Sequence, residues 1–326
     1  MFSFRALLIA SYVFFTCGGT ASAQGEDSTR YERDAQVISQ LLPGVYDNYN
    51  QVYFDGRMGL PKAEIHKRRE IGIKRLSGSR DSPQSVFKVT DKMTMNVDRY
   101  GNTAEQRRVF ETGKVFVVFA NNEEQGVQMD VYVDSGDDPI KAISEREADC
   151  SVLFVREASQ FSSSPLGGCR NMSTEYVLSE KQLFVSRHPE QGDGLDTQVP
   201  YQLNRARLFQ CYVDIPGVSG GRDEPYERYE GYTIHDQGGS FEITTRDADK
   251  RRFVITLSNI DWPINNHHDV FTRDVLVFYL SERTEEGVIN LGYSFTEPTV
   301  KRMGMNLKWL LMSCWMESNK VTKPFL

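Results

Sequence analysis

The chain contains five cysteines, and their number and spacing decide what chemistry their sulfur atoms can do. Cys17 lies in an apolar N-terminal stretch, which leaves Cys150, Cys169, Cys211 and Cys314 for the folded protein. No Cys-x-x-Cys spacing occurs, which disfavours a zinc site, whereas an even number of cysteines favours two disulfides. Three pairings are compatible with four cysteines, and we favour Cys150–Cys169 and Cys211–Cys314. The first bridge would contribute ~3 kcal/mol by closing a short loop.

Two stretches that contain histidine could supply metal ligands. "IHDQGG" places His235 beside Asp236, and "NNHHD" places His267 and His268 before Asp269. Imidazole and carboxylate groups bind transition metals, but adjacent histidines in a strand point to opposite faces. The neighbouring Asn and Gly residues are typical of ordered loops. We therefore favour a structural role for these histidines and expect no metal site.

The sequon Asn171-Met172-Ser173 follows Cys169 closely. Asn-x-Ser is the acceptor sequence for N-glycosylation and is compatible with a position on the surface. We therefore expect Asn171 to be a glycosylation site.

The N-terminus has the pattern of a secretory signal peptide. Arg5 precedes an apolar stretch at 6–17, and the small residues Ala21 and Ala23 predict cleavage after Ala23. The apolar stretch is shorter than a membrane-spanning helix, and no later segment is long and apolar enough, so we expect no transmembrane span. The mature chain is expected to be secreted or lumenal, where disulfides persist, and plastid routing remains open.

Composition and charge indicate an ordinary globular protein. Of the 326 residues, 39% are hydrophobic and 25% are charged, and the formal net charge is −7. A nucleic-acid-binding protein needs a positively charged face for phosphate contacts, so we expect no nucleic-acid partner. The composition leaves a homodimer open.

Alternating apolar and polar residues, many of them β-branched or aromatic, predict that most of the chain forms β-strands. The predicted strands span 114–120, 127–134, 151–157, 174–187, 207–215, 240–246, 252–260, 274–282, 290–295 and 306–315. One helix is predicted at 33–42, where Ala35, Ile38, Leu41 and Leu42 share a face. Because helical patterns do not alternate with the strands, an all-β barrel or sandwich is favoured over a parallel α/β fold.

A Gly- and Pro-rich stretch at 214–225 marks the expected boundary between two units. The expected divisions are a signal peptide at 1–23, a β-barrel at 24–216 and a C-terminal β-rich extension at 217–326. The extension contains all three tryptophans of the protein, and such large aromatic side chains usually anchor packing. We therefore expect the extension to pack on the barrel and to be tied to it by Cys211–Cys314.

Several stretches of the first unit resemble the CpcT/CpeT family of chromophore lyases. "LLPGVYDNYNQ" at 41–51 is similar to the family's opening, and "DRYGNTAEQRRVFE" at 98–111 is similar to its Tyr-Arg-Gln-Arg strand, apart from one position. The most specific match is 150–184, with two cysteines around an alternating strand and then a Thr-x-Tyr-x-x-Ser-Glu strand. "EQGDGLD" at 190–196 resembles the following turn, without its Arg.

The resemblance implies a calyx-like, lipocalin-like antiparallel β-barrel that holds a linear tetrapyrrole (bilin). Such a lyase promotes addition of a Cys of an acceptor phycobiliprotein to the phycobilin, mainly by positioning the reactants, and requires no further cofactor. Together with the strand pattern, it predicts an all-β fold with this barrel, a short N-terminal helix and an additional C-terminal β-unit. The alternative is a non-catalytic secreted barrel that binds a bilin, another pigment or a different hydrophobic small molecule.

Holding a bilin requires a carboxylate for the protonated pyrrole nitrogens and arginines for the propionates. The candidate ligand-binding residues in the matched stretches are Asp98, Tyr100, Arg107, Arg108, Tyr176 and Glu180. Arg107 and Tyr100 are the first choices among them, and a surface ion pair or a core tyrosine is the structural alternative for each. No catalytic residue is assigned, and Cys169 is not expected to be a nucleophile because a disulfide has no free thiolate.

Overall fold

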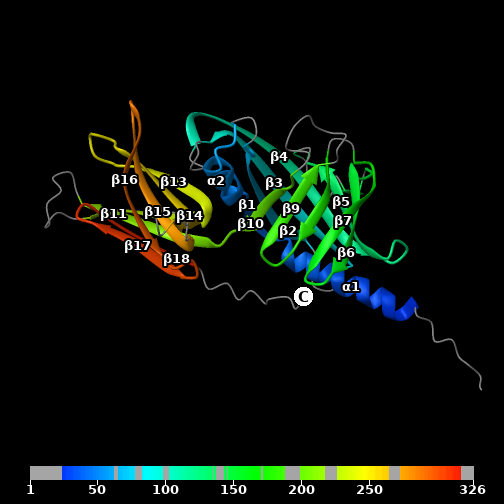
Figure 1. Cartoon of the computed structure of the whole chain (residues 1–326). Coiled ribbons are helices and arrows are strands. Elements are labelled where there is room, and N and C mark those ends of the chain that lie inside the picture. The colour runs from blue at the N-terminus through cyan, green and yellow to red at the C-terminus, as the bar shows by residue number, and fades with distance from the viewer. Residues whose placement is uncertain are drawn as a thin grey trace, which may run out of the picture.

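A computed structural model of the chain shows two β-rich parts side by side, a barrel and a sandwich (Figure 1). The residues that the structure describes are 24–61, 65–77, 83–97, 103–134, 136, 143–144, 146–169, 172–187, 199–216, 226–263 and 272–316. The predicted fold class, an antiparallel β-barrel with an N-terminal helix and additional C-terminal strands, is confirmed. Among the described helices, none has the length and apolar character needed to cross a membrane.

Ten strands form a closed antiparallel barrel in the order β1-β10-β9-β8-β7-β6-β5-β4-β3-β2. They are β1 (Gly44–Asp47), β2 (Arg68–Ser77), β3 (Gln84–Val97), β4 (Thr103–Asn121), β5 (Gly126–Val133), β6 (Cys150–Glu157), β7 (Gln160–Gly167), β8 (Ser173–Leu178), β9 (Gln182–Arg187) and β10 (Tyr201–Arg205). Strand β1 closes the ring because it pairs with both β2 and β10. Closure satisfies the edges, and every second side chain then points into the barrel.

Helix α1 (Gln24–Leu41) closes one end of the barrel (Figure 1). Ile38 and Leu41 are completely buried and belong to the same apolar core as Phe87 inside the barrel. The Tyr46 hydroxyl donates a hydrogen bond of 2.6 Å to the Leu41 carbonyl, and Arg205 donates to the same oxygen at 3.0 Å. Barrel side chains thus satisfy a carbonyl that the helix end leaves without an intrahelical partner.

The helix expected from the sequence lies within α1, which begins earlier in the chain. A second helix, α2 (Tyr49–Arg57), was not expected. It connects β1 to β2, and its sequence mixes aromatic, β-branched and Gly residues, which have modest or low helix propensity. Tertiary contacts therefore decide its conformation.

The other eight described strands form two four-stranded sheets, ordered β12-β11-β18-β17 and β13-β14-β15-β16. They are β11 (Leu208–Pro216), β12 (Tyr226–His235), β13 (Gln237–Thr244), β14 (Arg252–Pro263), β15 (Thr272–Thr284), β16 (Gly287–Thr296), β17 (Arg302–Leu307) and β18 (Leu310–Met316). Phe209 and Met312 of the first sheet share one apolar core with Phe253 and Phe278 of the second. Two sheets around one core make this part a β-sandwich.

Strand β11, which we expected in the barrel unit, pairs with β12 and β18 of the sandwich. The chain therefore changes from barrel to sandwich between Arg205 and Leu208, ahead of the boundary expected at 216. The Gly- and Pro-rich stretch connects two neighbouring strands of one sheet, so its composition reflects a hairpin connection.

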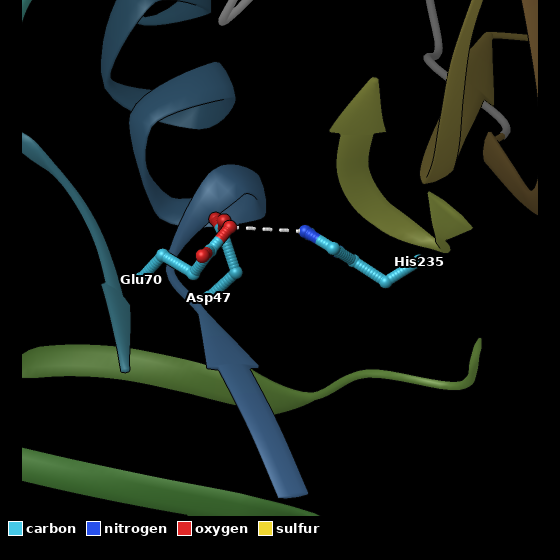
Figure 2. A group of neighbouring side chains, drawn as sticks. All are labelled: Asp47, Glu70 and His235. Atoms are coloured by element: carbon cyan, nitrogen blue, oxygen red, sulfur yellow. Dashed lines mark hydrogen bonds and ion pairs between the residues drawn. The ribbon is translucent and has the colours of Figure 1, made fainter. Parts of the chain in front are cut away.

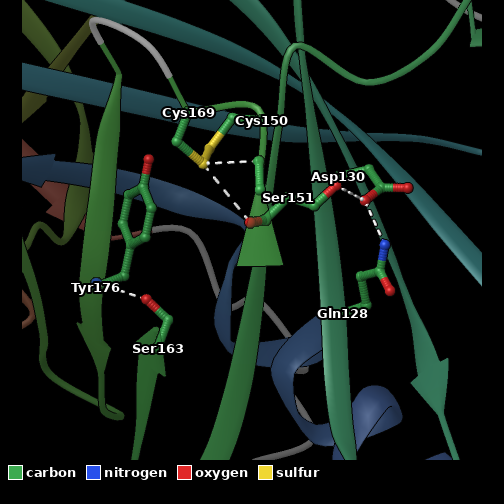
Figure 3. The surroundings of a disulfide bond; sticks show 8 residues. Gln128, Asp130, Cys150, Ser151, Ser163, Cys169 and Tyr176 are labelled. Atoms are coloured by element: carbon green, nitrogen blue, oxygen red, sulfur yellow. Dashed lines mark hydrogen bonds between the residues drawn. A yellow bond between two sulfur atoms is a disulfide. The ribbon is translucent and has the colours of Figure 1, made fainter. Parts of the chain in front are cut away.

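Both predicted disulfides are present, and they are consistent with an oxidising, extracytoplasmic compartment. Cys150 begins β6 and is bonded to Cys169, which follows β7 (Figure 3). Cys211 and Cys314 lie opposite each other on β11 and β18. The second bridge therefore joins two strands of the sandwich. We had expected it to tie the extension to the barrel, and that expectation was wrong because β11 belongs to the sandwich. The predicted signal peptide and Asn171 of the sequon lie outside the described residues.

Removal of the second bridge should destabilise the sandwich selectively. Its cysteines are 103 residues apart, and constraining a loop of that size stabilises a fold by about 4.7 kcal/mol at most. The three tryptophans belong to β14, β18 and the turn before β18, so their fluorescence during urea unfolding reports on the sandwich. We expect a clearly lower midpoint for Cys211→Ala/Cys314→Ala. Cys150→Ala/Cys169→Ala is the control. An equal shift of the urea midpoint in both variants would contradict the placement of the Cys211–Cys314 bridge in the sandwich.

Candidate functional site

The barrel interior is filled near α1 and accessible at the opposite end. Near α1, the inward-facing Phe87 and Phe154 are at most 1% exposed. At the other end, Phe110 and Val133 are 56% and 46% exposed. Phe110 lies an even number of residues before Phe116, which belongs to the barrel core, so both face inward. Among the described residues, the barrel is therefore closed by α1 at one end and exposes inward-facing side chains at the other, and we call this interior the calyx.

The strand register brings charged side chains together near the accessible end. Arg69 of β2 lies opposite Met93 of β3, and Met93 lies opposite Phe110 of β4. Asp91 is two residues from Met93, and Lys114 is four residues from Phe110, so both share the inward face. We call Arg69, Asp91 and Lys114 the calyx cluster.

Asp91 is the centre of the calyx cluster. Its carboxylate accepts hydrogen bonds from Arg69 Nε at 2.9 Å and Nη2 at 2.7 Å, and from Lys114 Nζ at 3.0 Å. Burial alone would raise the pKa of Asp91, but the hydrogen bonds and charges of Arg69 and Lys114 outweigh it and hold that pKa well below its usual range. The carboxylate therefore stays ionised inside the barrel.

The calyx cluster has one positive charge in excess, because two cations face one carboxylate. Arg69 Nη1 is buried and has no hydrogen-bond partner among the described residues. A buried N–H donor without a partner is costly, and guanidinium groups bind carboxylates strongly. The cluster can therefore accept an anionic group from a ligand.

Aromatic rings line the interior beside the calyx cluster. The Tyr176 ring lies 6.4 Å from that of Phe116 and 6.3 Å from that of Phe154, measured between centroids. Arg69 lies over the ring of Tyr201 at 5.1 Å. Figure 3 shows Tyr176 on β8 in the neighbourhood of the Cys150–Cys169 bridge. Such rings form an apolar surface beside the charged cluster, and this combination suits an amphipathic small molecule.

Of the six residues predicted to bind ligand, the structure places Tyr176 inside the barrel. Glu180 is exposed in the turn between β8 and β9, next to Lys181, whose carbonyl accepts from the backbone of Arg205 near α1. It is therefore at the closed end, away from the calyx cluster. The other four residues lie outside what the structure describes. Asp98 and Tyr100 are not among the described residues, and the side chains of Arg107 and Arg108 are not described.

No residue of the calyx cluster was among the six residues predicted to bind ligand. A signal was present for Arg69, because Arg69, Ile71 and Ile73 alternate with polar residues in "RREIGIK". A charged residue in the inward phase of a barrel strand is expensive to bury and needs a partner. The partners come from β3 and β4, and only the register identifies them.

A second polar cluster joins the barrel to the sandwich (Figure 2). Asp47, Glu70 and His235 bring potential metal ligand atoms within 4.8 Å of one another. Asp47 is completely buried and pairs with Arg68 at 3.1 Å, whereas Glu70 accepts from His235 Nε2 at 3.2 Å and lies 3.6 Å from Lys92 Nζ. Cationic side chains already face both carboxylates, so we interpret the group as an ion-pair network. His267 and His268 lie outside the described residues.

The same contact region is closely packed. Arg68 donates to the carbonyls of Gln237 and Gly238, where the chain turns from β12 to β13. Gly238 has a φ of +74°, and a Cβ atom there would lie 2.2 Å from the ring of Tyr49. Tyr49 also packs with Ile260 in an apolar cluster of the sandwich. Glycine is therefore required at 238 both for its backbone conformation and for the close approach.

Comparison of the chain with models of known families, with curated proteins and with solved structures finds no match. The fold and its two polar clusters define the chain as a closed antiparallel barrel with an amphipathic calyx, followed by a β-sandwich. These comparisons therefore assign neither a ligand nor an activity to the chain.

The barrel–sandwich network should make stability depend on pH in the acid range. The hydrogen bond from His235, with the nearby positive charges, outweighs burial and lowers the pKa of Glu70 to about 2. Because the folded pKa is below the unfolded value of about 4.3, this carboxylate stabilises the fold above pH ~4.3 and loses its effect as the pH falls toward 2. We expect Glu70→Gln to lower Tm at pH 6, with the difference from wild type disappearing near pH 2.

Thermal unfolding between pH 6 and pH 2 measures this difference. Glu286→Gln, an exposed residue in the turn between β15 and β16, is the matched control and should leave the profile unchanged. A difference between Glu70→Gln and wild type that stays constant over the whole range would contradict the role of Glu70.

Proposed function

We propose that the barrel binds an amphipathic ligand through a carboxylate group and that this ligand is a linear tetrapyrrole. The observation that carries the proposal is the positive excess of the calyx cluster, Arg69 and Lys114 against Asp91, beside the rings around Tyr176. Bilin propionates supply carboxylates, and the flat pyrrole system has large apolar faces. The choice of a bilin comes from the resemblance of residues 150–184 to the chromophore lyases.

By that resemblance, the chain would act as a lyase on an acceptor phycobiliprotein. The acceptor thiol adds across the ethylidene double bond of the bilin, so that a C–S bond forms and the thiol proton passes to the adjacent ring carbon. The cysteines of the two disulfides have no thiol to contribute, and the acceptor would supply it. Arg69 and Lys114 would hold the propionates, and the barrel would accelerate the addition by orienting the bilin.

The alternative function is non-catalytic binding of a bilin, another pigment or a different apolar carboxylate. The two disulfides favour this alternative because they indicate an oxidising compartment, in which the acceptor protein would also have to be present. The calyx cluster serves binding equally well in both cases. Transfer of the bilin to an acceptor is therefore the property that separates the two.

Titration of the full chain with phycocyanobilin tests the binding proposal. We expect a red-shifted absorption band and a saturable affinity. Lys114→Met should weaken that affinity about 10- to 100-fold, because a hydrogen bond to a charged group contributes roughly 1.5–3 kcal/mol. Asp91 keeps its partner Arg69 in this variant, so the fold should survive, which near-ultraviolet circular dichroism can verify.

Lys88→Met is the matched control, because Lys88 lies on β3, is half exposed and pairs with Asp134 outside the calyx cluster. Equal affinity in wild type and Lys114→Met would remove the calyx cluster from the binding site. If the bilin binds, incubation with an acceptor apoprotein and denaturing electrophoresis distinguish the functions. Bilin covalently bound to the acceptor supports the lyase, and binding without transfer supports the carrier.

A further inference from the structure

A groove of about 340 Å³ lies on the outside of the barrel, between α2 and the strands β9 and β10. Asn50, Phe54 and Met58 recur every four residues and line it from one face of the helix. On β10, Leu203 belongs to the barrel core, so the neighbouring Asn204 faces outward into the groove. The groove and the calyx cluster therefore lie on opposite faces of the barrel wall.

Carboxamide groups dominate the polar lining of this groove. Gln182 Nε2 donates to Asn204 Oδ1 at 3.1 Å, which leaves Gln182 Oε1 and the Asn204 side-chain N–H groups without a partner among the described residues. Asn50 Oδ1 is buried and likewise has no partner among them. Gln202 adds another amide on the same wall. The groove thus offers neutral donors and acceptors side by side.

The one carboxylate of the described lining is already paired. Asp55 Oδ2 accepts hydrogen bonds from the backbone N–H of His66 at 2.9 Å and from its Nδ1 at 2.6 Å. Both side chains are more than nine-tenths buried. Because this pair is satisfied internally, the groove offers a charged ligand little to bind, in contrast to the calyx cluster.

The groove is also held in a fixed shape. Gln51 Nε2 donates to the Pro200 carbonyl at 3.0 Å, and Gln51 Oε1 accepts from the backbone N–H of Gln202 at 3.1 Å. These bonds attach α2 to β10, so the two walls keep their spacing. A preformed site loses less free energy on binding than one that must be ordered by its ligand.

Apolar side chains complete the rim. Phe54 is 38% exposed and Met58 is 68% exposed, and both line the groove. A ligand that fits would therefore present neutral donors and acceptors at its edge and an apolar face to the ring of Phe54. A sugar ring has both properties, since its hydroxyl groups project outward and its C–H bonds form a face that packs on aromatic rings. The volume of the groove is within the range of small-molecule sites.

We propose that the groove between α2 and β9–β10 binds a neutral sugar, as a free disaccharide or as the end of a glycan. The inference rests on the outer wall of the barrel and does not depend on the proposed function of the calyx. The two disulfides are consistent with an extracytoplasmic compartment, where glycans are displayed.

Calorimetric titration of the full chain with maltose, cellobiose, lactose and N,N′-diacetylchitobiose tests the proposal. We expect saturable binding of at least one of them. Asn204→Leu and Phe54→Ala should each weaken it about tenfold or more, because the first removes hydrogen-bonding groups and the second removes the stacking surface. Both residues lie on the surface of the groove, and an unchanged Tm would verify that the variants fold.

Asn290→Leu, an exposed amide on β16, is the matched control and should bind as wild type does. Failure of all four disaccharides to bind would overturn the proposal, and so would equal affinity in wild type and Asn204→Leu. Binding of an N-acetylated dipeptide amide in place of the sugars would show that the amides recognise peptide backbone, and that result would overturn it as well. Phycocyanobilin binding should be unaffected by Asn204→Leu, which separates this site from the calyx.

Discussion

The alternation of side chains along β2 is the constraint on which the rest of the architecture depends. Arg69 points into the calyx and binds Asp91, whereas its neighbours Arg68 and Glu70 point outward to Asp47 and His235. Three consecutive charged residues thus serve two faces of one wall. A shift of one residue in the register of β2 would place two charges in the barrel and one in the sandwich contact. Each of these ions needs a specific partner, so the ion pairs disfavour such a shift.

Asn48, which lies between β1 and α2, holds this strand in place. It is completely buried, its side-chain oxygen accepts from the backbone N–H of Arg69 at 2.7 Å, and its amide donates to the Lys67 carbonyl at 3.0 Å. The same amide lies 3.3 Å from Gln51 Oε1. One side chain therefore links α2 to the start of β2. At this point of β2, alternate side chains face the calyx and the sandwich.

Burial of ions in an apolar barrel is expensive, and this cost explains the composition of the calyx cluster. A carboxylate with two cationic partners stays ionised, whereas removal of one partner of a buried pair typically costs about 3–5 kcal/mol. Two cations around Asp91 mean that the cluster remains paired when one of them also contacts a ligand. A carboxylate ligand would therefore neutralise the remaining positive charge without separating Arg69 from Asp91.

Much of the fold could be predicted from the sequence because its signals are local. Strand alternation, the amphipathic face that contains Ile38 and Leu41, and the even number of cysteines that follow Cys17 all depend on nearby residues or on simple counting. The membership of β11 in the sandwich and the meeting of Arg69, Asp91 and Lys114 depend on pairing between distant strands. Such pairing follows from the register and from barrel closure, which no short stretch encodes. The short helix α2 was missed because tertiary hydrogen bonds, rather than propensity, stabilise it.

The residues that carry the resemblance at 41–51 can be explained by architecture. Asn48 and Gln51 bind backbone groups at the starts of β2 and β10, so they fix the wall of the calyx. Any protein that uses this barrel would need such groups, whatever its ligand, so this part of the resemblance supports the fold more strongly than the activity. The calyx cluster is different, because among the described residues two cations face one carboxylate, and this excess of positive charge is costly to bury. Arg69, Asp91 and Lys114 are therefore the residues that support ligand binding. The stretch 41–51 explains how the wall that carries them is held in position.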